Sequence, residues 1–209
     1  MSEAALRYIA LGDSYTIGTG ASHPSRNFPN QLAYRLEVAT GRGVEVRNPA
    51  VHGYKTEDLI REELPELGNF RPDVATVLIG VNDLVEDADQ LEYRSKLRQI
   101  YAEIAQYVKP AMVAAISIPD FSIAPAAARF GSPDDLRSRV EAFNAVASQE
   151  AASAGFRYVD LVAASRSEPS RAGWFASDQL HPGDGQYAAW TAWIWECLKD
   201  LWPAVARGR

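Results

Sequence analysis

The sequence predicts an α/β fold, a three-layer α/β/α sandwich around a doubly wound sheet of five parallel strands. Short apolar runs alternate along the chain with longer amphipathic stretches. Strands that alternate with helices are joined by right-handed crossovers, which makes the strands parallel and covers both faces of the sheet with helices. We expect one domain over residues 1–209, because this length supports a proper core and neither a repeat nor a low-complexity linker divides the chain.

The five expected strands are short apolar runs at residues 8–11, 44–47, 74–79, 112–118 and 158–161. The amphipathic stretches between and after them predict helices at 28–39, 56–66, 90–108, 134–154 and 182–201. In the last helix, apolar side chains recur every three or four residues, which predicts one face packed against a core. These residues are Tyr187, Trp190, Ile194, Leu198 and Leu201.

Two segments lack a periodic pattern. Residues 119–133 contain three prolines and exceed the usual length of a connection, so we expect a binding or lid loop there. The second irregular segment is 163–179, and it leads into the last helix.

The composition excludes several classes of protein. Hydrophobic residues make up 47% of the chain and charged residues 23%, which is typical of a soluble globular protein. A net charge of -6 argues against a nucleic-acid partner, which needs a basic face. No run of 18 apolar residues predicts a membrane span, and the first residues lack a basic signal-peptide region, so we expect a cytoplasmic protein.

The cysteine and histidine content predicts neither a disulfide nor a metal site. Cys197 is the only cysteine, and its apolar neighbours suggest a small core residue. The three histidines, His23, His52 and His181, share no spacing that is typical of metal ligands. We therefore expect no metal and no cofactor.

Polar clusters follow four of the expected strands. The first strand leads to "GDSY" with Ser14, the second to "NPAVHG" with Gly53, and the third to "GVND" with Asn82. After the fifth strand the chain supplies "SDQLHPG", which contains Asp178 and His181. Because ligands bind at the carboxyl ends of strands in an open parallel sheet, we expect all four clusters to meet at one edge.

These residue types are those that acyl transfer requires. A serine hydroxyl is a weak nucleophile and needs a base within hydrogen-bond reach. Asp178 and His181 are three positions apart before a proline, so the aspartate can orient one ring nitrogen while the other faces Ser14. The N–H groups of Ser14 and Gly53 and the side-chain amide of Asn82 supply three donors for an oxyanion. The pattern predicts a Ser14–His181–Asp178 triad with an oxyanion hole.

Each of these residues also has an ordinary structural interpretation when it is taken alone. Ser14 and Asn82 fit turns, Gly53 fits a backbone position with positive φ, and Asp178 fits a cap for the last helix. Their joint presence at strand ends favours the catalytic interpretation.

Two residues within these clusters do not belong to the expected triad or oxyanion hole. We expect Asp13 to brace the turn before Ser14 rather than to act in catalysis. We expect His52 to be a loop residue without a role, the alternative being a contact with substrate.

Other motif families fit less well. "GDSYT" is not G-x-S-x-G, so the nucleophile elbow of the α/β-hydrolases is absent from the sequence. "GTGASH" breaks the dinucleotide fingerprint G-x-G-x-x-G at its last glycine, and no P-loop motif occurs.

The four clusters resemble the sequence blocks of the SGNH hydrolase superfamily, the GDSL-type esterases and lipases. The resemblance extends from residue 8 to the final helix, and the order of strands and helices agrees with the flavodoxin-like sheet of that family. The chain departs from the family pattern at Tyr15, where leucine is frequent, and at Pro49 and Ala50 in the second block. The resemblance implies metal-independent hydrolysis of an ester or thioester through an acyl-serine intermediate.

The leading hypothesis is a hydrolase acting on a small carboxylic ester. Phe121, Ile123 and Phe130 from the first irregular segment, with Trp174 and Phe175 from the second, would line an apolar pocket for a short or medium acyl group. The alternative for the last two is that they only anchor their segment.

Two other functions remain open. The same acyl-enzyme could pass its acyl group to a sugar or another alcohol. The chain could also be a non-catalytic binding module, although the intact serine, histidine, aspartate and asparagine speak against it.

Overall fold

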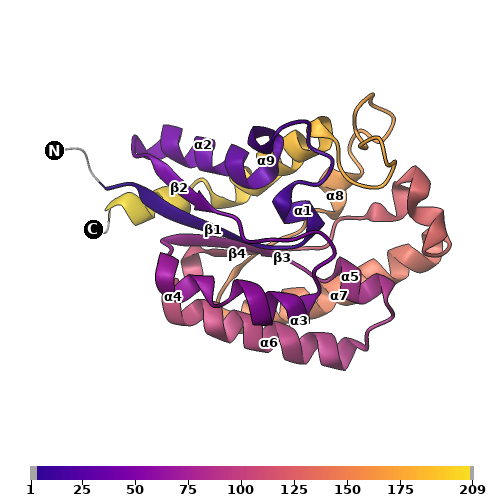
Figure 1. Cartoon of the computed structure of the whole chain (residues 1–209), viewed down its shortest axis with the longest axis horizontal. Helices are drawn as coiled ribbons and strands as arrows, with labels where there is room; N and C mark the ends of the chain where they lie inside the picture. Colours follow the sequence, from indigo (N-terminus) through magenta and orange to yellow (C-terminus); the bar gives the residue numbers. More distant parts are fainter. Residues whose placement is uncertain (1–3, 208–209) are drawn as a thin grey trace.

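The computed structural model describes residues 4–207 and has a five-stranded, entirely parallel sheet at its centre (Figure 1). The strands are β1 (Leu6–Gly12), β2 (Val44–Arg47), β3 (Val74–Leu78), β4 (Val113–Ile116) and β5 (Arg157–Val159), in the order β2-β1-β3-β4-β5. All five expected strands are present, with ends that differ by a few residues. Because β1 lies between β2 and β3, the direction of winding reverses at β1 and β3, which is where a ligand crevice forms in this type of sheet.

Helices cover both faces of the sheet (Figure 1). One layer contains α1 (Ser14–Ile17), α2 (Phe28–Thr40), α8 (Val162–Ser165) and α9 (Asp184–Leu198). The other contains α3 (Thr56–Asp58), α4 (Glu66–Phe70), α5 (Val81–Val85), α6 (Gln90–Tyr107) and α7 (Pro133–Ala154). The three-layer, doubly wound α/β/α fold that the sequence predicts is therefore confirmed.

The long helices begin and end at residues suited to these positions. The Asn27 side chain caps α2 by accepting the Asn30 N–H, and Gly41 ends that helix at a φ of 70°. Ser132 caps α7 in the same way, and Gly155 ends it at a φ of 72°. These local signals explain why the expected boundaries of the two helices differ little from the observed ones.

The apolar stripe of the last helix faces the core, as expected. Tyr187, Trp190, Ile194 and Leu198 are fully buried in α9, whereas Leu201 lies beyond the end of the helix and is half-buried. α9 packs beside α2 over the same face of the sheet. This packing places the N-terminal end of α9 at the edge of the sheet where the strands end (Figure 1).

The continuous helix expected at 56–66 is wrong. The segment consists of α3, a π-helical turn η2 (Leu59–Glu63), and then α4. Pro65 has no N–H to donate and therefore interrupts the helical hydrogen bonds between η2 and α4.

The segment 119–133 is also more regular than expected. It contains two 3-10 helices, η4 (Phe121–Ile123) and η5 (Pro125–Arg129). The Asp120 side chain caps η4 by accepting the Ser122 N–H. Single turns such as these, and the short helices α1, α5 and α8, contain too few residues to produce a periodic pattern.

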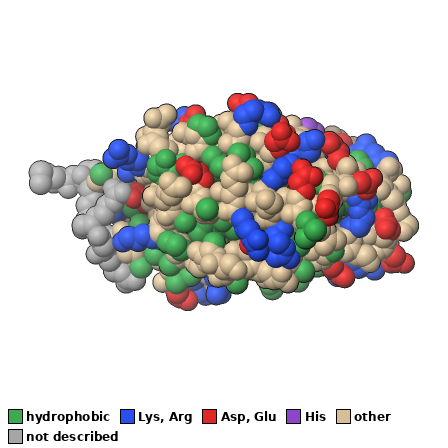
Figure 2. All heavy atoms as spheres, turned by 90° about the horizontal axis from the view of Figure 1, so that it is seen from below, with side chains coloured by type: hydrophobic (Ala, Val, Ile, Leu, Met, Phe, Trp, Pro, Cys, Tyr) green, Lys and Arg blue, Asp and Glu red, His purple; other side chains and the backbone are tan. Residues whose placement is uncertain are grey.

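The outer surface of the α6 layer carries charges of both signs, interspersed with apolar and neutral side chains (Figure 2). On α6, Lys96 forms ion pairs with Glu92 (2.7 Å) and with Glu57 of α3 (3.7 Å). Within residues 4–207, no helix combines the length and the apolar character that crossing a membrane requires.

Candidate active site

Ser14 lies directly after the central strand β1. Gly12 ends that strand, and Asp13 caps α1 by accepting the Tyr15 N–H at 3.0 Å. Ser14 is the first residue of α1 and is 4% exposed. Asp13 therefore braces the turn that presents Ser14, as the sequence analysis expects.

The loop before α9 brings His181 and Asp178 to Ser14. The Nδ1 of His181 lies 2.5 Å from the Oδ2 of Asp178, and its Nε2 lies 3.2 Å from the Oγ of Ser14. The other carboxylate oxygen of Asp178 accepts the N–H groups of Leu180 and His181, both at 3.0 Å. One imidazole therefore connects the serine hydroxyl to the carboxylate.

The surroundings of Asp178 keep its carboxylate ionised. Burial by itself would raise its pKa, but hydrogen bonds from the His181 ring and from the N–H groups of Leu180 and His181 outweigh burial and lower the pKa to about 2. An ionised carboxylate at this position accepts the Nδ1 proton of His181 and leaves Nε2 free to accept a proton. The Asp178 carboxylate is thus placed to orient the His181 ring.

Gly53 lies in the exposed loop between β2 and α3. Its φ is 86°, and a Cβ built at this position would meet no atom within 4 Å, so the glycine is required by the backbone conformation rather than by crowding. Within residues 4–207, neither the N–H of Gly53 nor that of Ser14 donates to another group. Both N–H groups are therefore free to donate to a ligand.

Asn82 is the second residue of α5 and is half-buried. Its Nδ2 donates to the carbonyl of Tyr54 at 2.8 Å, which orients the amide beside the loop that contains Gly53. Asp83 accepts from the N–H and the hydroxyl of Thr56, at 3.0 and 2.5 Å. Two adjacent residues of α5 thus attach the Gly53 loop to the end of β3.

His52 contacts the same group of residues. Its ring centroid lies 5.1 Å from that of His181, and its Nδ1 is 3.2 Å from the Oγ1 of Thr19. These contacts place the backbone of the neighbouring Gly53 next to His181 and the segment that follows Ser14. Adjacency to Gly53 is the one sequence signal that points to this position.

Trp174 does not line a pocket, contrary to the expectation. Its side chain is fully buried, and its indole N–H donates to the carbonyl of Ser165 at 3.2 Å. A side chain without exposed surface cannot contact a substrate, so Trp174 anchors the segment between α8 and α9. The alternative considered in the sequence analysis is correct for this residue.

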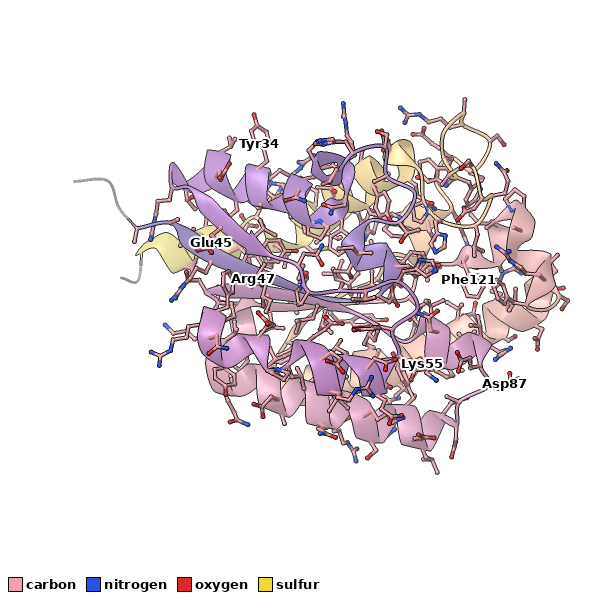
Figure 3. The ribbon with its side chains drawn as sticks, in the orientation of Figure 1. Tyr34, Glu45, Arg47, Lys55, Asp87 and Phe121 are labelled. Carbon is pink, nitrogen blue, oxygen red and sulfur yellow. The ribbon has the colours of Figure 1, made fainter. Side chains whose placement is uncertain are left out.

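The other four expected pocket residues gather at the carboxyl end of the sheet, where Figure 3 shows Phe121. Phe121 is buried and contacts Phe130 edge to face at 6.3 Å, whereas Ile123, Phe130 and Phe175 are half-buried. Phe121 and Phe175 share with Tyr15 a cavity of about 10 Å³. That volume holds about one water molecule, so it offers no room for an acyl chain.

A larger groove lies elsewhere. It has a volume of about 700 Å³ and is lined by Tyr34, Val38 and Trp195 among others. Figure 3 shows Tyr34 projecting from α2 away from the sheet, nearer the opposite end of the molecule from Phe121. This groove contains none of the residues that surround Ser14.

In the described part of the chain, no cluster of three or more His, Cys, Asp or Glu side chains is arranged to hold a metal ion.

Glu63 is a further residue beside the site, and the motifs in the sequence do not point to it. This residue is fully buried, and its Oε2 accepts the N–H of Gly12 at 2.9 Å, two residues before Ser14. A signal was present, because Glu63 lies four positions from both Leu59 and Leu67, which are fully buried. An acidic residue on an apolar face is unusual.

Three solved structures of enzymes are similar to this chain over most of its length. The lipase/acylhydrolase from Enterococcus faecalis has 24% identity and a TM-score of 0.73, and 93% of this chain and 96% of that chain are covered. LAE5, an α/β hydrolase from the metagenome of Lake Arreo, has 21% identity and a TM-score of 0.74, with 95% and 98% covered. A variant of Axe2, an acetyl xylan esterase from Geobacillus stearothermophilus, has 20% identity and a TM-score of 0.72, with 94% and 95% covered. These likenesses support the fold.

A comparison of the sequence with curated proteins found no match. The model of the GDSL-like lipase/acylhydrolase family matches residues 10–189, a span that begins within β1 and ends within α9. The match includes all four polar clusters at the strand ends, and it confirms the resemblance seen in the sequence. This chain belongs to the GDSL-like lipase/acylhydrolase family.

Proposed function

We propose that this protein is a serine hydrolase that cleaves carboxylic esters, with Ser14 as nucleophile, His181 as general base and Asp178 as the group that orients His181. One observation carries the proposal: the Nε2 of His181 is 3.2 Å from the Oγ of Ser14 while its Nδ1 is 2.5 Å from the Asp178 carboxylate. This geometry is that of an activated serine.

In the first step, the Oγ of Ser14 attacks the ester carbonyl carbon and transfers its proton to the Nε2 of His181. The Asp178 carboxylate stabilises the imidazolium that forms. The carbon–oxygen bond to the alcohol then breaks, and His181 returns the proton to the departing oxygen. The products of this step are the free alcohol and an ester of Ser14.

The negative charge that develops on the carbonyl oxygen requires hydrogen-bond donors. The free N–H groups of Ser14 and Gly53 and the second Nδ2 proton of Asn82 would supply three. The bond from Asn82 to the Tyr54 carbonyl holds the amide in place before substrate binds, so little reorganisation accompanies the reaction.

In the second step, water hydrolyses the acyl-serine. His181 accepts a proton from the water as its oxygen attacks the acyl carbon, and then returns it to the Oγ of Ser14 as the carboxylic acid leaves. We take hydrolysis rather than transfer to another alcohol as the proposal: Ser14 is only 4% exposed, but His52 and Gly53 beside it are exposed, and the Asp178 side chain is 42% exposed. Water would therefore approach the acyl-enzyme from the side of His52 and Gly53.

We infer that the acyl group is short. The cavity lined by Tyr15, the residue after Ser14, has about 10 Å³ and is too small for an acyl chain, so a long chain would have to lie along the surface. A structural neighbour that is described as an acetyl xylan esterase is compatible with a small acyl group.

The experiment is to measure hydrolysis of p-nitrophenyl acetate, butyrate and longer esters by wild-type protein, Ser14→Ala and the control Ser95→Ala. Ser95 is exposed on α6. We expect acetate and butyrate to be the best substrates, Ser14→Ala to lose about 10⁴-fold or more in kcat, and Ser95→Ala to match wild type. Wild-type turnover by Ser14→Ala would exclude Ser14 as nucleophile. An acylated product from an added alcohol or sugar would instead favour acyl transfer.

A further inference from the structure

Glu63 is an acid held in the interior by an unusual turn. It ends the π-helical segment η2, in which the Leu64 N–H donates to the carbonyl of Leu59 at 3.1 Å. Such turns are rare and frequently mark functional positions. Glu63 is fully buried, and within residues 4–207 its Oε1 has no hydrogen-bond partner, while its Oε2 accepts the N–H of Gly12. The turn therefore places a carboxyl group at the end of β1.

The backbone at this point is tightly packed. Gly12 has a φ of 150°, and a Cβ at this position would lie 2.2 Å from the carbonyl oxygen of Leu78 and 2.4 Å from the Oγ1 of Thr16. Asp13 follows and caps α1, and Ser14 is the next residue. The hydrogen bond from Gly12 to Glu63 thus holds a crowded peptide two positions before the serine hydroxyl.

The surroundings of Glu63 disfavour a negative charge on it. In the described chain, Glu63 forms no ion pair, and the acidic groups that raise its pKa are Asp13 before α1 and Asp58 of α3. Burial is the largest effect on the pKa of Glu63, and the charges of Asp13 and Asp58 add to it. The hydrogen bond from the Gly12 N–H lowers the pKa but does not compensate, so the pKa is raised to about 8. The carboxylate of Asp13 is itself fully buried, and its Oδ2 has no partner among the described residues. Two charges side by side in this interior would repel each other strongly.

We propose that Glu63 is a positioning residue, that its neutral carboxyl group fixes the turn that carries Ser14, and that ionisation of this carboxyl displaces the turn. This inference rests on the proposed hydrolase function. Glu63 does not touch the reacting atoms; it acts through Gly12 and Asp13. Turnover is therefore lost at alkaline pH through a group remote from the triad.

The test compares the pH dependence of kcat for wild-type protein, Glu63→Gln and Glu62→Gln. Glutamine keeps an oxygen that accepts the Gly12 N–H but cannot ionise, and Glu62 is the exposed neighbour that serves as control. We expect the wild-type kcat to fall above about pH 8, by up to about tenfold per pH unit, with KM unchanged. Glu63→Gln keeps its kcat at alkaline pH, and Glu62→Gln follows wild type. Identical profiles for wild type and Glu63→Gln would overturn the inference.

A second measurement needs no variant. The ¹³C NMR resonance of the Glu63 side-chain carboxyl in wild-type protein should titrate with a midpoint near pH 8, and a midpoint near the ordinary value of 4.5 would overturn the inference. The experiments distinguish a failure of the proposed hydrolase function from a failure of the inference about Glu63. Wild-type protein that hydrolyses no ester overturns the proposed function and the inference with it. Hydrolysis with identical pH profiles overturns the inference alone.

Discussion

The Nε2 of His181 lies 3.2 Å from the Oγ of Ser14, although 167 positions separate the two residues in the chain. A second contact of similar sequence separation holds them together: the N–H and the hydroxyl of Ser22 donate to the Asp184 carboxylate at 2.8 and 2.5 Å. Ser22 follows α1, and Asp184 begins α9. The segments on either side of the site are thus joined independently of Ser14 and His181.

Replacement of Asp178 by asparagine should lower kcat by about 10⁴-fold. Asparagine fits the same space but has no negative charge to stabilise the imidazolium, and it does not fix the Nδ1 proton of His181. Steady-state kinetics on a p-nitrophenyl ester checks this, with Asp134→Asn as control because the Asp134 side chain is 92% exposed. A loss below tenfold in Asp178→Asn would assign the orienting role to another group.

Replacement of Asn82 by alanine should lower kcat by about 10²- to 10³-fold and change KM little. The reason is that the amide would donate to an oxygen whose charge develops only in the transition state. Asn69→Ala is the matched control, since Asn69 is exposed on α4. An effect confined to KM would show that Asn82 binds the substrate rather than the oxyanion.

Gly12 and Gly41 both have positive φ, yet they should respond differently to alanine. At Gly12 the added methyl group meets the Leu78 carbonyl, so we expect a loss of about 3 kcal/mol or more in the free energy of unfolding. At Gly41 a Cβ would meet nothing within 4 Å, and only the backbone conformation is strained, which costs about 1–2 kcal/mol. Chemical denaturation of the two variants measures both values. Equal losses would contradict the crowding at the end of β1.

Stability should depend on pH through Glu63. The pKa of this group is raised from 4.5 to about 8 in the folded protein, so its contribution to stability is fully present below pH 4.5 and is lost as pH rises to about 8. The free energy of unfolding of wild type should therefore fall relative to that of Glu63→Gln across this window, by at most about 1.4 kcal/mol per pH unit. Denaturation at several pH values measures the difference, and a constant difference would show that Glu63 ionises normally.

Local patterns were sufficient to predict the strands and most long helices. Each of these elements is long enough to show a period, and residues such as Asn27 and Gly41 mark helix ends. The amphipathic character of segment 56–66 predicts one helix, whereas Pro65 and the π-turn divide it. A π-turn adds one residue to a helical turn, and this changes the spacing of apolar side chains too little to be recognised in the sequence.

The candidate site was predictable where the function depends on residue type and strand order. Ser14, Gly53, Asn82, Asp178 and His181 were identified because the carboxyl ends of parallel strands meet at one edge of the sheet. Whether Trp174 lines a pocket could not be predicted, since an aromatic residue in an irregular segment can either line a cavity or fill the interior. Its complete burial in the structure excludes it from a substrate pocket.

The sequence by itself determined the order of strands and helices and the identity of the chemical groups at the strand ends, because both follow from local composition and spacing. Only the tertiary structure decided that Glu63 reaches the backbone before Ser14, that Asn82 is held by the Tyr54 carbonyl, and that Trp174 is buried. The physical reason is that burial and hydrogen bonding depend on distances between segments remote in the chain, and those distances are set by how the layers pack.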